Sequence, residues 1–375
     1  TGQIDLSIPL TSGALDWGLK ISDIKTSSAQ NFFDQTEQGA VLNPSLSDDF
    51  QYQENIFAAY FNITRDWEQW SLDLGLRAEQ TEVRATSKNL GEVNNQYYFE
   101  LFPKMSLLYT ANENNSFGLS YSRSIARPNY ESLNPFRYFI NENNYTDGNP
   151  NLVPEIDSKY TFSYTHNNTW FLEAYYWHIK NPLEELRFQN NTTRALQNLE
   201  TNLIKGYQYS LDLTYAKSVT SWWYLQVVTS GFFIENEFLA QQSAQQTALA
   251  NTYGFYGQIY SGLVLSEQAN ITSDVTALYI SNLIFGSYTY KNQFNLSASV
   301  RKKIWDKKAS ITLGVDDIFN TNNIPVVSRY ANQDNGYFAR TESRLFRVGF
   351  TYNFGNSKLR DNNREITTKE SDRLN

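Results

Sequence analysis

Apolar and polar residues alternate along this chain with a period of two, and this pattern limits its fold more than any other feature. It is clearest over residues 70–79, where the apolar positions are Trp70, Leu72, Leu74, Leu76 and Ala78. Successive side chains of a strand point to opposite faces. The segment is therefore predicted to be a strand with one oily face, and with a wet face made of Ser71, Asp73, Gly75, Arg77 and Glu79.

The same alternation recurs over residues 117–122, 207–215, 294–301 and 346–354, with no helical segment to cover the oily face. The polar faces carry small groups such as Ser, Thr, Gly and Asn more often than Lys and Glu, which suits the wall of a wide lumen. An all-β fold, a transmembrane antiparallel β-barrel that is apolar outside and polar within, is the simplest structure with these properties.

The pattern predicts about fifteen strands. They lie at 3–10, 15–25, 52–64, 69–84, 97–110, 116–126, 157–167, 170–181, 204–216, 222–234, 253–265, 270–281, 288–302, 308–319 and 341–354. The strands and their connections make up a predicted barrel domain, residues 1–355. The polar stretch 356–375 is predicted to be a flexible periplasmic tail.

Short and long connections alternate between these strands. The short class is 11–13, 65–68, 111–115, 167–169 and 266–269, and the long class is 26–51, 85–96, 127–156, 182–203, 235–252 and 320–340, with a shorter member near 282–287. Outer-membrane barrels place short turns in the periplasm and long loops outside. Within the loop 235–252, residues 239–246 are predicted to form a short helix. Because single-chain bacterial barrels have an even number of strands, we expect the N-terminal part of this barrel to lie outside the sequence.

Composition narrows the function. The chain has 375 residues and a formal net charge of −8, which argues against a nucleic-acid partner. It has no cysteine, and its two histidines, His166 and His178, have no second histidine at metal-ligand spacing. The sequence also has no nucleophile elbow, phosphate loop or dinucleotide fingerprint. We therefore expect no enzyme activity, no metal and no cofactor.

The alternation also predicts which residues line the lumen wall. Counting from the apolar positions, the polar side chains that would contact a ligand inside the barrel are Asp73, Arg77, Glu79, Gln208, Asp212, Asn295, Arg301, Arg347 and Asn353. A shift of one residue in register would turn all of them towards lipid.

Several short motifs resemble the TonB-dependent outer-membrane receptors, and most closely the C-terminal barrel part of the Bacteroidetes-type outer membrane β-barrel proteins. The most specific is the order Ser122-Arg-Ser-Ile-Ala-Arg-Pro128, Leu133-Asn-Pro-Phe136 and Gly148-Asn-Pro-Asn-Leu-Val-Pro-Glu155. Glu54 to Tyr60, Asp317 to Asn320 and the aromatic closing segment Phe350 to Gly355 extend the resemblance over residues 54–355.

This resemblance implies a function and a setting. Receptors of this kind lie in the bacterial outer membrane, have about 22 strands around a plugged lumen, and take up a ligand when TonB moves the plug. It implies that this chain is the C-terminal part of such a barrel, with the plug and the TonB-contacting segment upstream. The ligand is unidentified, and the resemblance leaves open a surface lipoprotein on the outer loops.

The motif loop has a physical interpretation of its own. Gly148 is expected to permit a turn with positive φ, and prolines stiffen the entry into the next strand. We therefore expect the loop to have a shaping role, with Asn149 and Glu155 as its candidates for the lumen wall. Its motif residues are Arg127, Pro128, Asn134, Pro135, Gly148, Asn149, Pro150, Pro154 and Glu155.

Three alternatives stay open at the level of sequence. A complete smaller barrel would act as a passive porin. A soluble β-rich binding module would use the alternation to cover an internal core. An outer-membrane barrel enzyme would need a nucleophile and base that the sequence does not supply.

Overall fold

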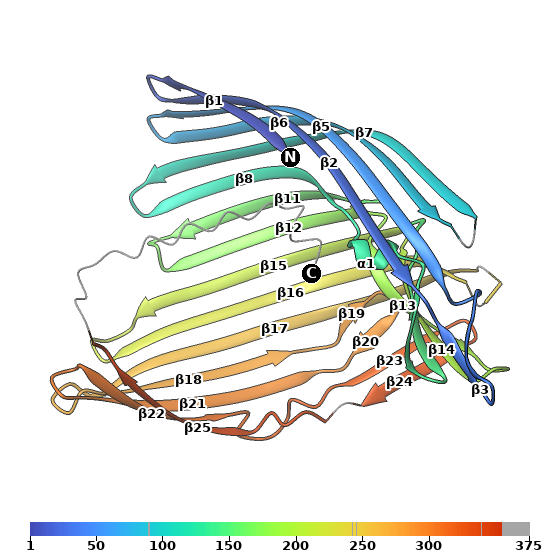
Figure 1. Cartoon of the computed structure of the whole chain (residues 1–375). Helices are drawn as coiled ribbons and strands as arrows, with labels where there is room; N and C mark the ends of the chain where they lie inside the picture. Colours follow the sequence, from blue (N-terminus) through green and yellow to red (C-terminus); the bar gives the residue numbers. More distant parts are fainter. Residues whose placement is uncertain (89–90, 242, 245, 339, 355–375) are drawn as a thin grey trace.

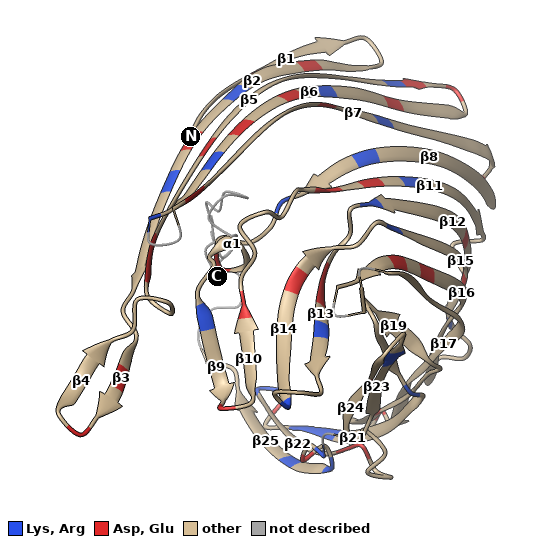
Figure 2. Ribbon diagram, turned by 90° about the vertical axis from the view of Figure 1, so that its right-hand side faces the viewer, with Lys and Arg blue, Asp and Glu red and all other residues tan. Residues whose placement is uncertain are grey.

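The computed structural model describes residues 1–88, 91–241, 243–244, 246–338 and 340–354. One antiparallel sheet of 15 strands dominates these residues and curves around a central space (Figures 1 and 2). The order in the sheet follows the chain, so each of these strands pairs with the sheet strands before and after it. The predicted tail, residues 356–375, lies outside the described residues.

Every predicted strand is present in the sheet, which confirms the all-β prediction. The strands are β1 (Gly2–Leu10), β2 (Gly13–Gln30), β5 (Asp48–Trp67), β6 (Trp70–Ser87), β7 (Glu92–Asn112), β8 (Asn115–Ala126), β11 (Glu155–His166), β12 (Trp170–Lys180), β15 (Lys205–Ser218), β16 (Trp223–Ala240), β17 (Gln246–Ser266), β18 (Ile271–Ile280), β21 (Gln293–Ile304), β22 (Ala309–Asp316) and β25 (Leu345–Tyr352). Strands β1 and β25 are the two edges, and no ladder joins them within the residues the structure describes.

The convex side of the sheet is apolar over most of its height. Leu19, Phe57, Leu211 and Leu313 are among the large hydrophobic side chains that are exposed there. An aromatic stripe crosses six neighbouring strands on this side, with ring centroids of direct cross-strand partners 4.6 to 6.4 Å apart: Tyr121, Tyr160, Tyr176, Tyr209, Phe233 and Tyr253. An exposed apolar surface this continuous is characteristic of a wall that faces lipid.

On strands β2, β5 and β6 the polarity of the convex side inverts at one level. Below this level Ile21 pairs with Phe57, and both are exposed. One rung above it, on the same side, Asp23 pairs with Asn55 and Asn55 pairs with Glu82. The opposite change occurs on the concave side. Because polar groups are costly in hydrocarbon, this level marks the outer boundary of the membrane.

The short connections lie at one end of the sheet and the excursions at the other (Figure 1). Two predicted long loops, 85–96 and 235–252, are wrong, because the strands simply continue past the membrane boundary. Ser87 still pairs with Glu92 across the first connection, and Ala240 with Gln246 across the second. The helix predicted at 239–246 is wrong for the same reason. The connection near 282–287 is longer than predicted and holds a hairpin.

The remaining excursions form small sheets of their own. One has β9 (Arg137–Asn141), β10 (Asn144–Asp147), β13 (Leu183–Asn190) and β14 (Ala195–Asn202), and the next has β19 (Leu283–Phe285), β20 (Tyr288–Tyr290), β23 (Pro325–Tyr330) and β24 (Gln333–Phe338). A short hairpin, β3 (Phe33–Thr36) and β4 (Gly39–Leu42), projects outward, whereas β9, β10, β13, β14 and helix α1 (Tyr130–Leu133) lie inside the curve of the sheet (Figure 2).

Two hydrophobic cores attach these inward excursions to the wall. In the first, the upper concave faces of β5 and β6 pack against the 127–154 excursion through Phe50, Tyr52, Val83, Ala85, Tyr130, Leu133, Phe136 and Leu152. In the second, β13 packs on β16 through Leu186, Phe188, Leu203 and Phe238. Loops are therefore packed against the concave side at the outer end of the sheet. Among the described residues, no helix has the length and apolar character needed to cross a membrane.

Candidate functional site

The concave side of the sheet carries the polar residues of the alternation. Cross-strand register places eight of the nine predicted lumen residues on this one side, and Asn353 follows the end of β25. Most of them have polar partners. Asp73 pairs with Lys104 at 2.9 Å, Gln208 donates to Tyr175 at 2.7 Å, and Arg347 pairs with Asp316 at 2.6 Å.

Three other predicted lumen residues form hydrogen bonds with hydroxyl groups. Asp212 accepts hydrogen bonds from Ser210 and Ser230, at 2.6 and 2.5 Å. Asn295 accepts one from Ser297, and Arg301 donates to Thr312 at 3.3 Å. These residues are spread over the whole wall. Gln208 and Asp212 lie close to Tyr175, and Asp73, Arg77 and Glu79 share another region.

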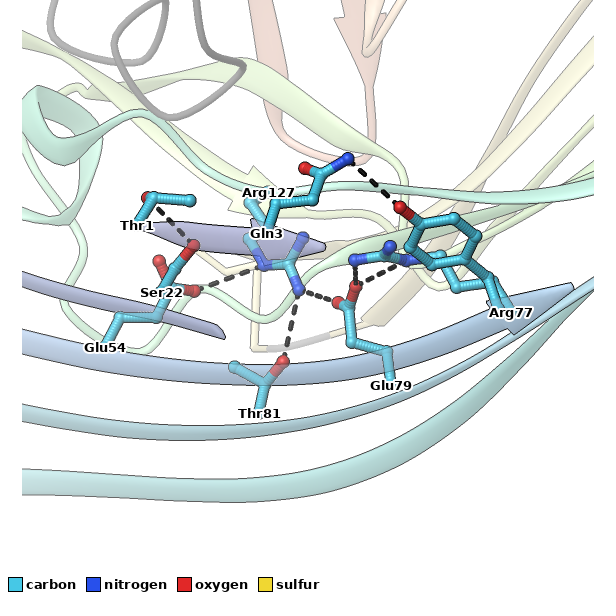
Figure 3. A network of polar contacts seen from close by, with 9 residues as sticks. Thr1, Gln3, Ser22, Glu54, Arg77, Glu79, Thr81 and Arg127 are labelled. Carbon is cyan, nitrogen blue, oxygen red and sulfur yellow. Dashed lines mark hydrogen bonds and ion pairs between the residues drawn. The ribbon is translucent and has the colours of Figure 1, made fainter. Parts of the chain in front are cut away.

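That region holds a charge network that we call the inner-wall network: Glu54, Arg77, Glu79, Thr81 and Arg127 (Figure 3). The Arg77 Nε donates to Glu79 Oε2 at 2.9 Å, and the Arg127 guanidinium pairs with the same carboxylate. The Arg127 Nε also lies 3.2 Å from Glu54 Oε1. Both carboxylate side chains are almost fully buried, 1% exposed at Glu54 and 3% at Glu79.

The network joins the wall to the motif loop. Glu54 is on β5 and Glu79 is on β6, whereas Arg127 is the first residue after β8 and begins the 127–154 excursion. A buried charge is tolerated only when a counter-charge satisfies it. Arg127 therefore fixes the point at which this excursion enters the concave space.

A cavity of about 630 Å³ lies against the inner-wall network. Tyr60 and Phe102 supply its aromatic surface, and Lys104 and Arg123 its further cations. Arg123 pairs with Glu100 at 2.6 Å, where β7 and β8 separate. A volume of this size, with apolar walls and a few charged groups, is suited to a small organic ligand.

The motif loop is shaped by a close backbone contact. Gly148 does not have the positive φ that we expected; the glycines with positive φ among the described residues are Gly13, Gly39, Gly91 and Gly286. Glycine is required at 148 because a Cβ there would lie 1.7 Å from the carbonyl oxygen of Asn134. This contact brings the Asn-Pro and Gly-Asn-Pro motifs together.

The remaining motif residues hold the loop in place. The Asn149 amide N–H donates to Ser132 O at 2.6 Å, and the Asn149 side chain donates to Glu200 O. Glu155 accepts from the Leu183 amide at 2.8 Å, which joins β11 to β13. Asn149 and Glu155 thus connect loop elements, while their contact with a ligand stays a prediction.

A second recess of about 450 Å³ lies among the outer loops, between residues 45–48 and the β9–β10 hairpin. Arg137 there makes a bidentate ion pair with Asp147, at 2.7 and 2.8 Å, and its guanidinium stacks over the Tyr145 ring at 3.9 Å. The Asp147 hydrogen bond raises the pKa of Arg137 above its ordinary value.

One outer-loop carboxyl has a strongly altered acidity. Burial, together with the nearby carboxylates of Glu155 and Glu200, raises the pKa of Glu184 on β13 to about 7. Within the described residues, no group of three or more His, Asp or Glu side chains is arranged to hold a metal ion. His166 hydrogen-bonds Asn115, and His178 stacks on Tyr207.

Sequence reasoning missed two of the five residues of the inner-wall network, Glu54 and Thr81, and also Lys104 in the wall of the cavity. Position parity alone places Glu54 and Lys104 on the concave face, because Glu54 and Tyr60 are an even number of residues apart, as are Phe102 and Lys104. The partnership of Arg127 with Glu54 had no sequence signal, since it depends on how the excursion folds.

A lipid-facing convex side, a polar concave side and packed loops at one end define a class: a transmembrane β-barrel of the bacterial outer membrane. The chain belongs to the outer membrane protein beta-barrel family, whose sequence model matches residues 1–352. This confirms the predicted barrel fold and its outer-membrane location. A search of curated proteins found no match to this chain.

Solved structures of uptake proteins have the same fold. The ferric-catecholate import receptor Fiu of E. coli K12 is 13% identical with a TM-score of 0.61, and the match covers 94% of this chain and 54% of Fiu. The ferric yersiniabactin uptake receptor FyuA of Yersinia pestis is 12% identical with a TM-score of 0.62, covering 94% and 53%. The copper transporter OprC is 10% identical with a TM-score of 0.63, covering 93% and 56%. This chain thus spans about half the length of the solved proteins it resembles.

Proposed function

We propose that this chain is the C-terminal part of the barrel of a TonB-dependent outer-membrane uptake receptor. Its outer loops would capture a ligand, and the ligand would cross the polar lumen when TonB displaces a plug. The motifs of residues 54–355 support this, and so does the likeness to Fiu, FyuA and OprC, whose names state import, uptake or transport. Those names also suggest a chelated metal ion as the class of ligand.

The observation that carries the proposal is the packing of the outer loops against the inside of the wall. The β9–β10–β13–β14 sheet and α1 lie inside the curve of the wall, and the inner-wall network and two hydrophobic cores hold them there. A passive pore needs an open path for diffusion. A receptor needs a closed mouth that holds a ligand until energy is supplied.

The test uses the native protein, extracted from outer membranes with detergent. It is passed over the immobilised periplasmic domain of TonB from the same bacterium, and it is separately inserted into planar lipid bilayers. We expect capture on TonB, together with no steady conductance. Steady conductance without capture would contradict the proposal and would favour the passive porin.

A further inference from the structure

One short turn at the periplasmic end differs from the others in charge. The β21–β22 connection and its flanks, residues 301–308, read Arg-Lys-Lys-Ile-Trp-Asp-Lys-Lys, and we call this segment the basic turn. In the described residues of the other short connections, the cations are Arg65 and Lys217, and the acids are Asp66, Glu68, Glu113 and Glu267. Positive charge is thus concentrated in one sector of the rim, in a chain whose net charge is −8.

The charges of the basic turn are available to a partner. Its four lysines are exposed, and none of them forms an ion pair within the part of the chain that the structure describes. The Arg301 side chain is on the concave face, where its Nε donates to Thr312. Among the described residues, the acid of the turn is Asp306 and the acid of the adjoining β17–β18 turn is Glu267, so positive charge is in excess over these two turns.

The basic turn also lies at the level where lipid headgroups begin. Trp305 is 62% exposed, and its ring meets Phe350 and Tyr352 edge-on, with centroids 5.8 and 6.0 Å away. Val300 and Ile311 continue the exposed convex side up to the turn, and Lys302 is two residues beyond Val300 on the same side. Tryptophan prefers the membrane–water interface, and a lysine beside it extends its ammonium to the headgroups.

The backbone of the turn is unusual as well. Trp305, Asp306 and Lys307 have φ of 52°, 53° and 68°, three successive left-handed residues without a glycine. Such a conformation is unfavourable for side chains with a Cβ and is concentrated at sites that bind or act. Here the three residues make up most of the turn and include Trp305 and Lys307.

We propose that the basic turn binds the phosphate groups of anionic phospholipids, specifically phosphatidylglycerol, in the periplasmic leaflet of the outer membrane. The lysines supply the positive charge, and Trp305 sets their depth. The interaction resembles that of juxtamembrane basic clusters, which gain affinity from each lysine near an anionic surface. It is independent of the uptake function proposed above, because it needs only the orientation of the barrel in the membrane.

The test is native mass spectrometry of the full protein, purified and then titrated with phosphatidylglycerol or with zwitterionic phosphatidylethanolamine of the same chain length. We expect the unmodified protein to retain phosphatidylglycerol at about tenfold lower lipid concentration than phosphatidylethanolamine. The variant K302Q/K303Q/K307Q/K308Q should lose this preference. A Trp305→Ala variant should keep the preference but release both lipids more readily.

A matched control changes four lysines at the opposite rim: K25Q, K88Q, K180Q and K291Q. Folding of each variant is checked by heat-dependent mobility on gels, since folded barrels migrate differently from unfolded chains. The control should retain the preference for phosphatidylglycerol. Equal loss in the control and in the basic-turn variant, or an unchanged preference in the basic-turn variant, would overturn the proposal.

Discussion

Arg127 and Glu79 form an ion pair that joins the start of the longest inward excursion to the middle of strand β6. The same arginine lies 3.2 Å from Glu54, so one guanidinium serves carboxylates on two neighbouring strands. Arg127 therefore ties the excursion to the wall of the sheet at this point. If the excursion left the concave space, Glu54 and Glu79 would both lose the positive charge of Arg127.

Replacing Arg127 with Gln should destabilise the barrel by about 3 kcal/mol or more, because a buried ion pair that loses one partner leaves an uncompensated charge. Denaturant unfolding in detergent micelles measures this change. The matched control is Arg84→Gln, an exposed arginine of β6 on the convex side above the membrane boundary. A loss no larger in Arg127→Gln than in the control would show that the network does not anchor the excursion.

Gly148→Ala should displace the motif loop, since the new Cβ would lie 1.7 Å from Asn134 O and 2.7 Å from the Asn134 carbonyl carbon. Neither atom can retreat, because both belong to backbone. Limited proteolysis should then cut within residues 127–154 at a faster rate than in the unmodified protein. Gly231→Ala is the control, as its Cβ would meet nothing within 4 Å, and an equal rate in both variants would contradict the contact.

The outer loops should tighten at acidic pH. The pKa of Glu184 is raised from an ordinary 4.5 to about 7. A carboxyl group whose pKa is higher in the folded state stabilises that state while the carboxyl is protonated. This stabilisation is complete below pH 4.5 and is lost as the pH rises through 7. Hydrogen exchange of residues 183–202, corrected for intrinsic rates, should quicken between pH 5 and pH 8 by more than in Glu184→Gln. Identical exchange profiles in the unmodified protein and in Glu184→Gln would contradict this prediction. The control variant is Glu82→Gln.

A charge placed on the convex side should be costly only below the membrane boundary. Leu211 is central among the outward-facing residues of β15 and is 55% exposed. Leu211→Arg should destabilise the barrel in lipid by about 2–4 kcal/mol, while Glu82→Arg above the boundary should change stability by at most about 1 kcal/mol. Unfolding in lipid vesicles measures both, and similar costs at the two positions would show that the boundary is misplaced.

The period-two pattern was sufficient to predict every strand of the large sheet. Lipid and the lumen are very different environments. The residue type at each position of a strand such as β6 therefore indicates which of the two its side chain faces. The prediction failed where that contrast ends. Beyond Glu82 the convex side of β6 carries polar residues and its concave side is packed against loops. The apolar and polar positions therefore exchange faces, and residues 85–96 resemble a loop in sequence.

The site was less predictable than the sheet. Parity placed Asp73, Arg77 and Glu79 on the concave side, but nothing local to Arg127 shows that it pairs with Glu54. The small sheets of the excursions were also missed, because strands of three to eight residues with mixed polarity carry no clear period. For Gly148 the residue type was informative, yet the reason was a close approach rather than a turn.

The central claim is that the convex side faces lipid up to one line and water above it. Because the chain has no cysteine, single-cysteine variants can be spin-labelled along β6 without background. We predict that oxygen accessibility in lipid bilayers alternates from 71 to 78 with maxima at Leu72, Leu74 and Leu76. At Glu82 and Arg84 accessibility to a water-soluble nickel complex should exceed that to oxygen. Oxygen maxima at Asp73 and Arg77, or no alternation, would contradict the account.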